Sequence, residues 1–363
     1  MQNTAEAGRG RTDVRQVKNV KISGLACAVP AAVREVLDLA EQFGVETIQK
    51  IIASTGVERR HIAQDECASD LCAAAARRLL SDLNVEPGSI DTLIFVSQTH
   101  DYTLPATACV LQERLGLPMT TAAFDVALGC SGYVYGLWLA SSLLSSGGSR
   151  RALLLVGDTV SKIVAEKDRS VAALFGDGGS ATVLDYDEGA LPMSFVLGTD
   201  GRGANNLIVP GGAFRDRQGT RAVLDEPVVR GPFDLYMNGA EIFAFTLARV
   251  PALIAALHAA AATSGNGIDK YVFHQANRFM LQHLAKRMKL PAEKVVLNMQ
   301  NFGNTSSTSI PLAISTGCTG DDGMASGRYM LAGFGVGYSW AGCVAQLENV
   351  LVSPLTVTEG GNQ

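Results

Sequence analysis

Residues 124–144, FDVALGCSGYVYGLWLASSLL, join an apolar strand to an apolar helix through a short loop. Cys130 lies in this loop, beside Gly129 and shortly before the predicted helix. The amides and the dipole at a helix start favour a thiolate, so this cysteine is a candidate nucleophile with a lowered pKa. A buried structural cysteine is the alternative interpretation at this point.

The alternation of strand and helix continues on both sides of this segment. Helical spacing of apolar residues predicts a helix over 65–83, and apolar runs predict strands over 90–98 and 151–159. A similar series of strands and helices begins near residue 193. Buried strands between helices favour a parallel or mixed sheet that is covered on both faces. We therefore expect an α/β protein built from the following parts: a flexible tail over 1–17, a half over 18–192 and a similar half over 193–363.

The composition is typical of a compact enzyme. Hydrophobic residues make up 47% of the 363 residues, and the net charge of −5 provides no broad basic field, so no nucleic acid is expected as a partner. The first residues contain no apolar run of signal-peptide length, and the chain has no 18-residue uncharged apolar stretch. A cytoplasmic protein without a membrane segment is expected. The seven cysteines form no CxxC pair and no zinc-like Cys/His spacing, so no metal site is expected.

Two polar residues further along the chain are candidate partners of Cys130. His274 follows the apolar strand in KYVFHQAN (270–277), and the ends of buried strands are where α/β proteins expose side chains to a site. Asn304 lies in NFGNTSSTSIPLAI (301–314), where a glycine and small polar residues allow a tight turn. Each residue taken alone is compatible with a structural role.

Six stretches carry a resemblance to a known family: STGVERRHI (54–62), ALGCSGY (127–133), DRSVAALFGDGGSATVL (168–184), FHQAN (273–277), FGNTSSTSIP (302–311) and GFGVGYSW (333–340). In this order they resemble the ketoacyl synthase III family of thiolase-like condensing enzymes, from about residue 19 to 350. The resemblance implies a five-layered αβαβα arrangement, a homodimer, no cofactor, and acyl-CoA and malonyl-acyl carrier protein as substrates. FGDGG and GFGVG are not dinucleotide loops, because neither follows a strand and opens a helix.

The resemblance also implies a role for each candidate residue. Cys130 would accept an acyl group from a thioester and release the first thiol. His274 and Asn304 would then donate hydrogen bonds to the enolate oxygen that forms when malonyl carrier loses carbon dioxide. The backbone N–H groups of Cys130 and Val336 would form the other oxyanion hole.

Several positions bear on the substrate and its carrier. Lys50 and Ser54 replace the tryptophan and arginine that clamp the adenine of coenzyme A in well-known members, whereas Arg169 matches the family's other nucleotide-contacting arginine. On the carrier-protein face, Ala244 and Phe279 replace expected basic residues. The remaining basic residues expected to contact the carrier are Arg278, Lys286 and Arg287.

Leu104, in THDYTLPAT, occupies the place where an aromatic residue from one subunit often closes the partner's acyl tunnel in this family. This departure indicates room for a different, longer acyl group. Leucine argues against the head-to-head condensing enzymes of hydrocarbon synthesis, which have a glutamate in this loop.

Three functions remain open from the sequence. The first is decarboxylative Claisen condensation, in fatty acid synthesis or in a specialised acyl pathway. The second is a cysteine-dependent acyltransferase that passes its acyl group to an amine or hydroxyl without decarboxylation. Asn304 argues against it, since simple acyl transfer forms no enolate. The third, a scaffold or binding subunit without activity, is disfavoured by the intact Cys130, His274 and Asn304 set.

Overall fold

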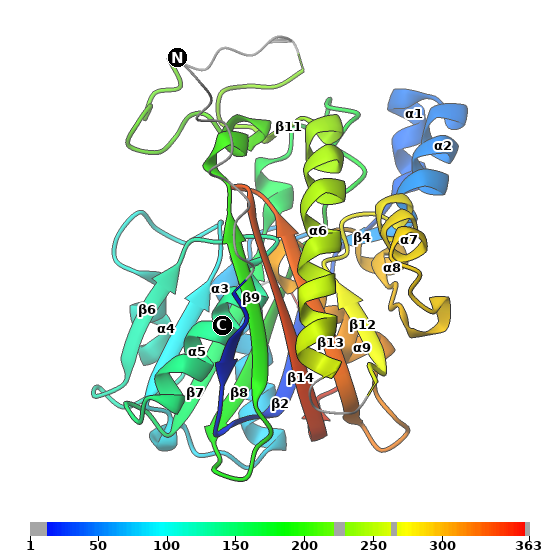
Figure 1. Cartoon of the computed structure of the whole chain (residues 1–363). Coiled ribbons are helices and arrows are strands. Elements are labelled where there is room, and N and C mark those ends of the chain that lie inside the picture. The colour runs from blue at the N-terminus through cyan, green and yellow to red at the C-terminus, as the bar shows by residue number, and fades with distance from the viewer. Residues whose placement is uncertain (1–12, 221–228, 263–266, 360–363) are drawn as a thin grey trace, which may run out of the picture.

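A computed structural model describes residues 13–220, 229–262 and 267–359. Ten strands of its 11-stranded sheet fall into two groups (Figure 1), and the eleventh, β15 (Thr356–Thr358), pairs with β2. The first group runs in the order β2 (Val20–Pro30), β8 (Gly178–Tyr186), β7 (Arg151–Asp158), β5 (Thr92–Val96) and β6 (Ala122–Val126). The second runs in the order β1 (Arg15–Val17), β9 (Met193–Thr199), β14 (Ser339–Val352), β13 (Met324–Gly335) and β12 (Lys270–Phe273). A short parallel pairing of β14 with β2 joins both groups into one sheet.

Each group is mixed, which is one of the two arrangements, parallel or mixed, that the sequence predicts. β5 pairs in parallel with β6 and β7, while β7 and β2 pair antiparallel with β8. In the second group β12 pairs in parallel with β13, and β14 pairs antiparallel with β13 and β9. All five residues of β5 are buried, which fits a strand covered on both faces.

The two faces of each group pack against different helices, because successive side chains of a strand point in opposite directions. In β5, Leu93 and Phe95 join the core that α3 (Ala68–Asp82) and α4 (Thr107–Arg114) cover. Ile94 and Val96 join the central core with α5 (Gly132–Ser145) and α9 (Ser309–Gly317). The second group alternates in the same way.

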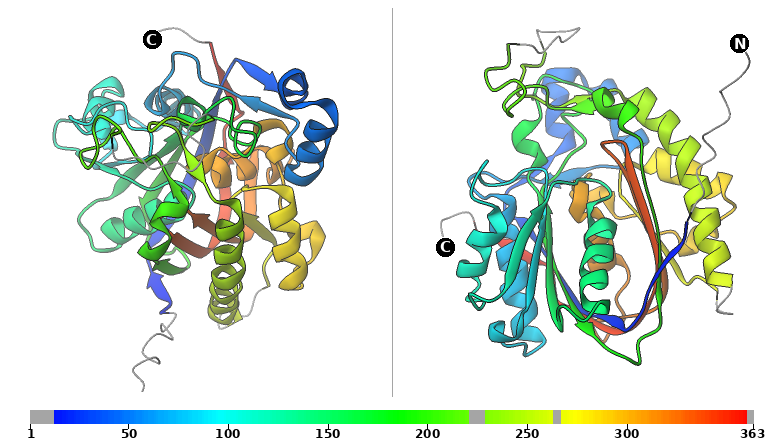
Figure 2. Two further views of the ribbon diagram at one scale, coloured as in Figure 1. Left: turned by 90° about the horizontal axis from the view of Figure 1, so that it is seen from above. Right: turned by 60° about the vertical axis from the view of Figure 1, so that its left-hand side comes forward.

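The outer face of the second group is covered by α6 (Gly239–Ala262) and α7 (Arg278–Arg287). Helices and strands thus alternate through five layers, with α5 between the two groups of strands (Figure 2). This confirms the predicted thiolase-like αβαβα arrangement.

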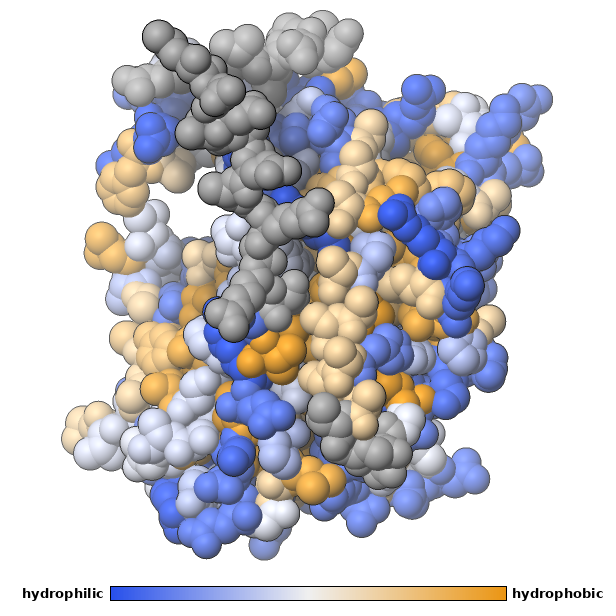
Figure 3. All heavy atoms as spheres, in the orientation of Figure 1, coloured by the Kyte–Doolittle hydropathy of each residue, from blue (hydrophilic) through white to orange (hydrophobic). Residues whose placement is uncertain are grey.

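α6 is long and apolar enough, by length and composition alone, to cross a membrane. In this fold its apolar residues, among them Val250, Leu253 and Leu257, pack on the sheet. Figure 3 shows apolar side chains along α6 and hydrophilic ones beside it, toward α2 (Val45–Thr55) and α7. About a third of this apolar stretch (33%) is buried, so packing on the sheet explains only part of its hydropathy.

The prediction of a flexible tail over 1–17 is wrong at its end. Residues 15–17 form β1, which pairs with β9 so that Arg15 lies opposite Phe195; residues 1–12 lie outside the described part. The division at residue 193 stays a prediction, and the first and last described strands each pair across it. β1 pairs with a strand of the second half, and β15 (Thr356–Thr358) pairs with β2.

Candidate active site

Cys130 lies in the loop between β6 and α5, where the sequence predicts a strand-to-helix elbow. Ser131 is the N-cap of α5, and the Gly132 N–H donates to the Gly129 carbonyl to form a tight turn. The C-terminal end of β13 passes close to the nucleophile. A Cβ atom built on Gly335 would lie 2.7 Å from both Cβ and Sγ of Cys130, so only glycine lets β13 approach this closely.

The environment of Cys130 favours the thiol over the thiolate, contrary to the sequence prediction. The residue is 8% exposed, and burial raises the pKa of its thiol to about 11. Hydrogen bonds from the backbone at Val336 and Cys130 and from the Ser306 side chain act in the lowering direction. Their effect on the pKa is smaller than the opposing effect of burial. The predicted lowered pKa is therefore wrong, because the helix-start argument leaves out desolvation.

A pH profile of alkylation should show this raised pKa. Since iodoacetamide reacts with the thiolate, alkylation of Cys130 is expected to accelerate about tenfold per pH unit from pH 7 to 10. Peptide mapping by mass spectrometry would follow the modification, with the exposed Cys109 as an internal reference for reagent access. A plateau of the Cys130 rate by pH 8 would contradict this description of the site.

His274 follows β12 directly, and one contact holds its backbone while another holds its ring. Its N–H donates to the Ala332 carbonyl over 2.8 Å, and its Nδ1 lies 2.7 Å from Oγ of Ser309 at the start of α9. Burial lowers the pKa of the imidazole to about 4, so the ring is neutral at pH 7. If the Ser309 hydroxyl donates to Nδ1, Nε2 carries the proton and is the donor.

Asn304 is oriented by its own loop. Its Oδ1 accepts from the Ser306 N–H over 2.9 Å, and its backbone N–H donates to the Leu174 carbonyl over 2.9 Å. Because Oδ1 is engaged, Nδ2 is the group left to donate to a ligand. The side chain is 5% exposed, so such a donor acts in a poorly hydrated place.

Ser306 connects the three predicted residues and was missed in the sequence. Its N–H donates to Oδ1 of Asn304 over 2.9 Å, it lines the same cavity as Cys130, and it affects the pKa of both Cys130 and His274. The residue has a φ of 50°, a region that few non-glycine residues adopt. The run GNTSSTS signals a tight turn, yet nothing in it signals a backbone that reaches three distant side chains.

Cys130 opens onto a cavity of about 280 Å³. Its wall is mainly apolar and consists of Val160, Ile163, Phe175, Leu207, Ile208, Val209, Leu235 and Val336, with Gln98, Thr99 and Ser306 as polar members. The volume is nearly twice that of the roughly 150 Å³ void that holds one benzene molecule in an engineered protein core. An acyl chain of medium length therefore fits beside the cysteine.

The other predicted contacts lie outside this cavity. Arg169 is exposed, and Arg278 is half-buried with Nη2 3.4 Å from the Gly56 carbonyl. Lys286 and Arg287 are exposed in the last turn of α7. Leu104 is 78% exposed and lines a wider pocket together with Tyr102 and Phe214. This wider pocket adjoins the cavity at Cys130, because Gln98, Thr99 and Ile163 line both. Cys130 and Val336 line the cavity, and Asn304 and His274 are buried beside it next to Ser306, whereas Arg169, Lys286 and Arg287 lie on the surface.

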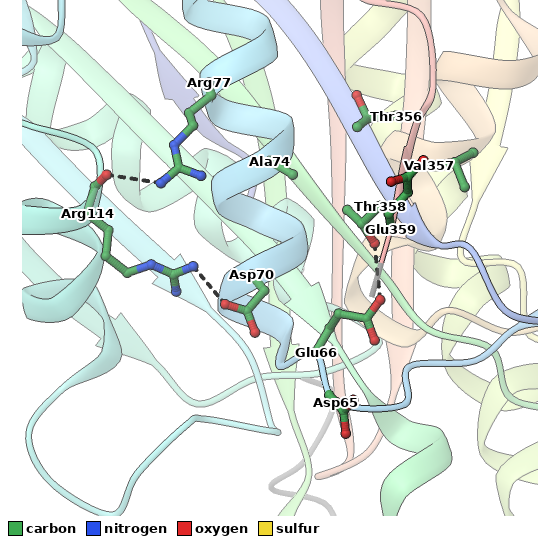
Figure 4. A pocket seen from close by; sticks show the side chains of 10 residues that line it. All are labelled: Asp65, Glu66, Asp70, Ala74, Arg77, Arg114, Thr356, Val357, Thr358 and Glu359. Carbon is green, nitrogen blue, oxygen red and sulfur yellow. Dashed lines mark hydrogen bonds and ion pairs between the residues drawn. The ribbon is translucent and has the colours of Figure 1, made fainter. Parts of the chain in front are cut away.

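A second cavity, of about 340 Å³, lies between α3 and β15 (Figure 4). Its charged side chains largely satisfy one another. Asp70 pairs with Arg114 at 2.7 Å, and Glu66 accepts from Thr358. Among the described residues, no group of three His, Cys, Asp or Glu side chains is placed to hold a metal ion. The described residues of this cavity therefore offer no candidate nucleophile, unlike those of the cavity at Cys130.

The five-layered fold, and a buried cysteine joined through Ser306 to a histidine and an asparagine, define a thiolase-like condensing enzyme. Two family models match the chain: 3-oxoacyl-[acyl-carrier-protein] synthase III over residues 124–201, and its C-terminal region over 258–347. A beta-ketoacyl-[acyl-carrier-protein] synthase III from Desulfitobacterium hafniense strain Y51 is 35% identical over 337 residues, which cover 90% of this chain and 98% of the relative. The chain belongs to the 3-oxoacyl-[acyl-carrier-protein] synthase III family.

Solved structures agree with this assignment. The 3-oxoacyl-(acyl-carrier protein) synthase of Burkholderia xenovorans LB400 is similar with a TM-score of 0.90 and 40% identity, over 96% of this chain and 99% of that chain. The priming beta-ketosynthase of the R1128 polyketide pathway is similar with a TM-score of 0.79 and 26% identity, over 92% of this chain and 97% of that chain. The protein is therefore an acyl-transferring condensing enzyme of the kind that primes fatty acid or polyketide synthesis.

Proposed function

We propose that the protein condenses an acyl thioester with malonyl-acyl carrier protein by way of acyl-Cys130, without a metal or other cofactor. In the first stage a bond forms between Sγ and the acyl carbon, the bond to the donor thiol breaks, and the Cys130 proton ends on the departing thiol. The N–H groups of Cys130 and Val336 lie at Sγ and stabilise the oxyanion. The single observation that carries this proposal is the grouping of Cys130, His274 and Asn304 around Ser306.

The second stage forms the new carbon–carbon bond. The malonyl group loses carbon dioxide, and the electron pair that remains becomes an enolate whose oxygen accepts from Nε2 of His274 and Nδ2 of Asn304. The enolate carbon attacks the acyl carbon, the bond from that carbon to Sγ of Cys130 breaks, and the released thiolate takes a proton from water. A neutral histidine and a fixed asparagine suit this stage, because both donate hydrogen bonds without holding the charged substrate too tightly in its ground state.

The experiment that tests this function compares acceptors. The protein would be incubated with an acyl thioester, and the Cys130 mass would be recorded before and after addition of malonyl carrier, of amines or of hydroxyl compounds. We expect an acyl adduct that only malonyl carrier discharges. Discharge by an amine or hydroxyl compound would support the acyltransferase alternative instead, and the lack of an adduct with every donor would support a binding role.

The acyl carrier protein is expected to dock on α7. Lys286 and Arg287 end this helix as an exposed basic pair, and Phe279 on the same helix is 57% exposed and stacks on Phe243 with ring centroids 5.7 Å apart. An acidic carrier would contact both the charges and the rings. Arg169 lies on a different loop and is proposed to contact a nucleotide-bearing donor such as acyl-CoA.

Reversing the charges of Lys286 and Arg287 tests this docking. The Lys286→Glu and Arg287→Glu double variant is expected to weaken binding of malonyl carrier about tenfold at low salt, and by less as salt screens the charges. Surface plasmon resonance would measure the affinity. The matched control reverses Arg77 and Arg78, an exposed pair on α3 in the opposite outer layer. An equal loss in both double variants would contradict docking on α7.

A cytoplasmic homodimer completes the proposal. β6 ends its group of strands, and its edge away from β5 has no strand partner in the described part of the chain. Met119, Tyr102 and Leu104 are exposed apolar side chains in the segments before β6 and after β5. A second copy covering this edge would bring Leu104 toward the partner's acyl cavity. All seven cysteines are free, as expected in a reducing compartment.

A further inference from the structure

One polar side chain that lines the cavity at Cys130 has no hydrogen-bond partner in the described part of the chain. Thr99 accepts through Oγ1 from the Thr159 N–H over 2.9 Å, and Ser306 contacts Cys130. Within the described residues, the side-chain amide of Gln98 forms no hydrogen bond; the residue is exposed, so water reaches this amide in the free protein. The remaining wall is mainly apolar. An acyl chain that covered this amide and displaced its water would leave it unpaired unless the chain carried a polar group, and an unpaired amide costs binding energy.

The backbone and the side chain of Gln98 are both held in place. Its backbone N–H donates to Oδ1 of Asp158 over 2.7 Å, and this fully buried carboxylate also accepts from the Ser307 N–H over 3.1 Å. Its side chain lies against Gly129, next to the nucleophile: a Cβ atom on Gly129 would be 1.8 Å from Oε1 of Gln98. Glycine at 129 therefore makes room for this amide beside Cys130.

We propose that Gln98 is a specificity-determining residue that hydrogen-bonds a hydroxyl or oxo group on one of the first carbons of the starter acyl chain. This inference rests on the proposed acylation of Cys130. The thioester oxygen is already served by the N–H groups of Cys130 and Val336, so Gln98 is free to meet a substituent further along. Its amide both donates and accepts, which suits either group. A site built to bind a substrate oxygen rejects the analogue that lacks it.

Competing acyl donors test this assignment. The protein would be mixed with octanoyl-CoA or 3-hydroxyoctanoyl-CoA, and the rate of adduct formation at Cys130 would be followed by intact mass. The hydroxylated chain is expected to react about tenfold faster. Gln98→Met keeps the length of the side chain and removes the amide, so its preference is expected to fall to unity or to reverse. The control, Gln42→Leu, changes an exposed glutamine of α1 (Ala40–Phe43), outside the cavity, and should keep the tenfold preference.

The outcomes separate this inference from the proposed function. If both chains acylate Cys130 at equal rates, or if Gln98→Met keeps the preference of the unchanged protein, the role of Gln98 is wrong and the condensing function stands. If neither chain forms an adduct, the proposed acylation fails, and the inference that rests on it fails too. Melting temperatures of the variants show whether a lost preference comes from a lost fold.

Discussion

Replacing Asn304 with alanine is expected to lower the rate of malonyl decarboxylation about 10²- to 10³-fold while leaving acylation of Cys130 nearly unchanged. Nδ2 of Asn304 is the donor left free once Oδ1 has accepted from Ser306, and an enolate forms only in the second stage. Losing one such donor costs roughly 3 kcal/mol of transition-state stabilisation. Release of labelled carbon dioxide and the Cys130 mass would measure the two stages separately.

A second substitution removes an ambiguity in this result. Alanine also takes away the acceptor of the Ser306 N–H, whereas Asn304→Asp retains an oxygen there and replaces the Nδ2 donor with a carboxylate oxygen. Both variants should lose decarboxylation. Asn301→Ala, which changes an exposed asparagine of α8 (Met299–Phe302) three residues away, is the control and should behave as the unchanged protein. An equal loss of acylation and decarboxylation would mean that the role of Asn304 is assigned wrongly.

Replacing Gly335 with alanine is expected to reduce acylation of Cys130 about 10²-fold. The added methyl group would lie 2.7 Å from Sγ and Cβ of the nucleophile. β13 cannot withdraw easily, because it pairs with β14 as far as Gly335 and Ser339. The thiol must therefore move, and a displacement of about 1 Å at a reacting atom costs this much in rate.

The rate of acyl-Cys130 formation would be measured by quenching the reaction at set times and recording the intact mass of the protein. Gly88→Ala is the control, since a Cβ atom at Gly88 meets no other atom within 4 Å. Overpacking a core typically costs about 1–3 kcal/mol, so a lower melting temperature is expected as well. Unchanged acylation in Gly335→Ala would show that the nucleophile is not held against β13 as described.

The apolar strands and the helical spacing predict a sheet covered on both faces, whereas the five layers follow from the family resemblance. Leu93 and Ile94 are adjacent in the chain and face opposite cores, which the uninterrupted apolar run already implies. The three residues of β1 escape prediction, because an edge strand of this length has no periodicity to detect. Its partner, Phe195, is far away in the chain.

The sequence indicates which residues belong to the candidate site, but not how buried they are or which contacts they make. Cys130, His274 and Asn304 follow from their motifs, and the structure brings them to Ser306. The raised pKa of Cys130 results from burial by Gly335 and neighbouring residues, which adjacency to a helix start does not report. Ser306 and Gln98 also escape prediction, because a positive φ and a side chain that crosses to another loop depend on contacts between distant segments.

The central claim is that acyl-Cys130 is consumed by a decarboxylative condensation. A single-turnover measurement tests it most directly: preformed acyl-Cys130 protein, freed of donor, is mixed with labelled malonyl carrier, and carbon dioxide, 3-oxoacyl product and remaining adduct are counted together. We expect one carbon dioxide and one 3-oxoacyl carrier for each acyl-Cys130 consumed. Loss of the adduct without carbon dioxide, with the acyl group transferred intact to another acceptor, would contradict the claim.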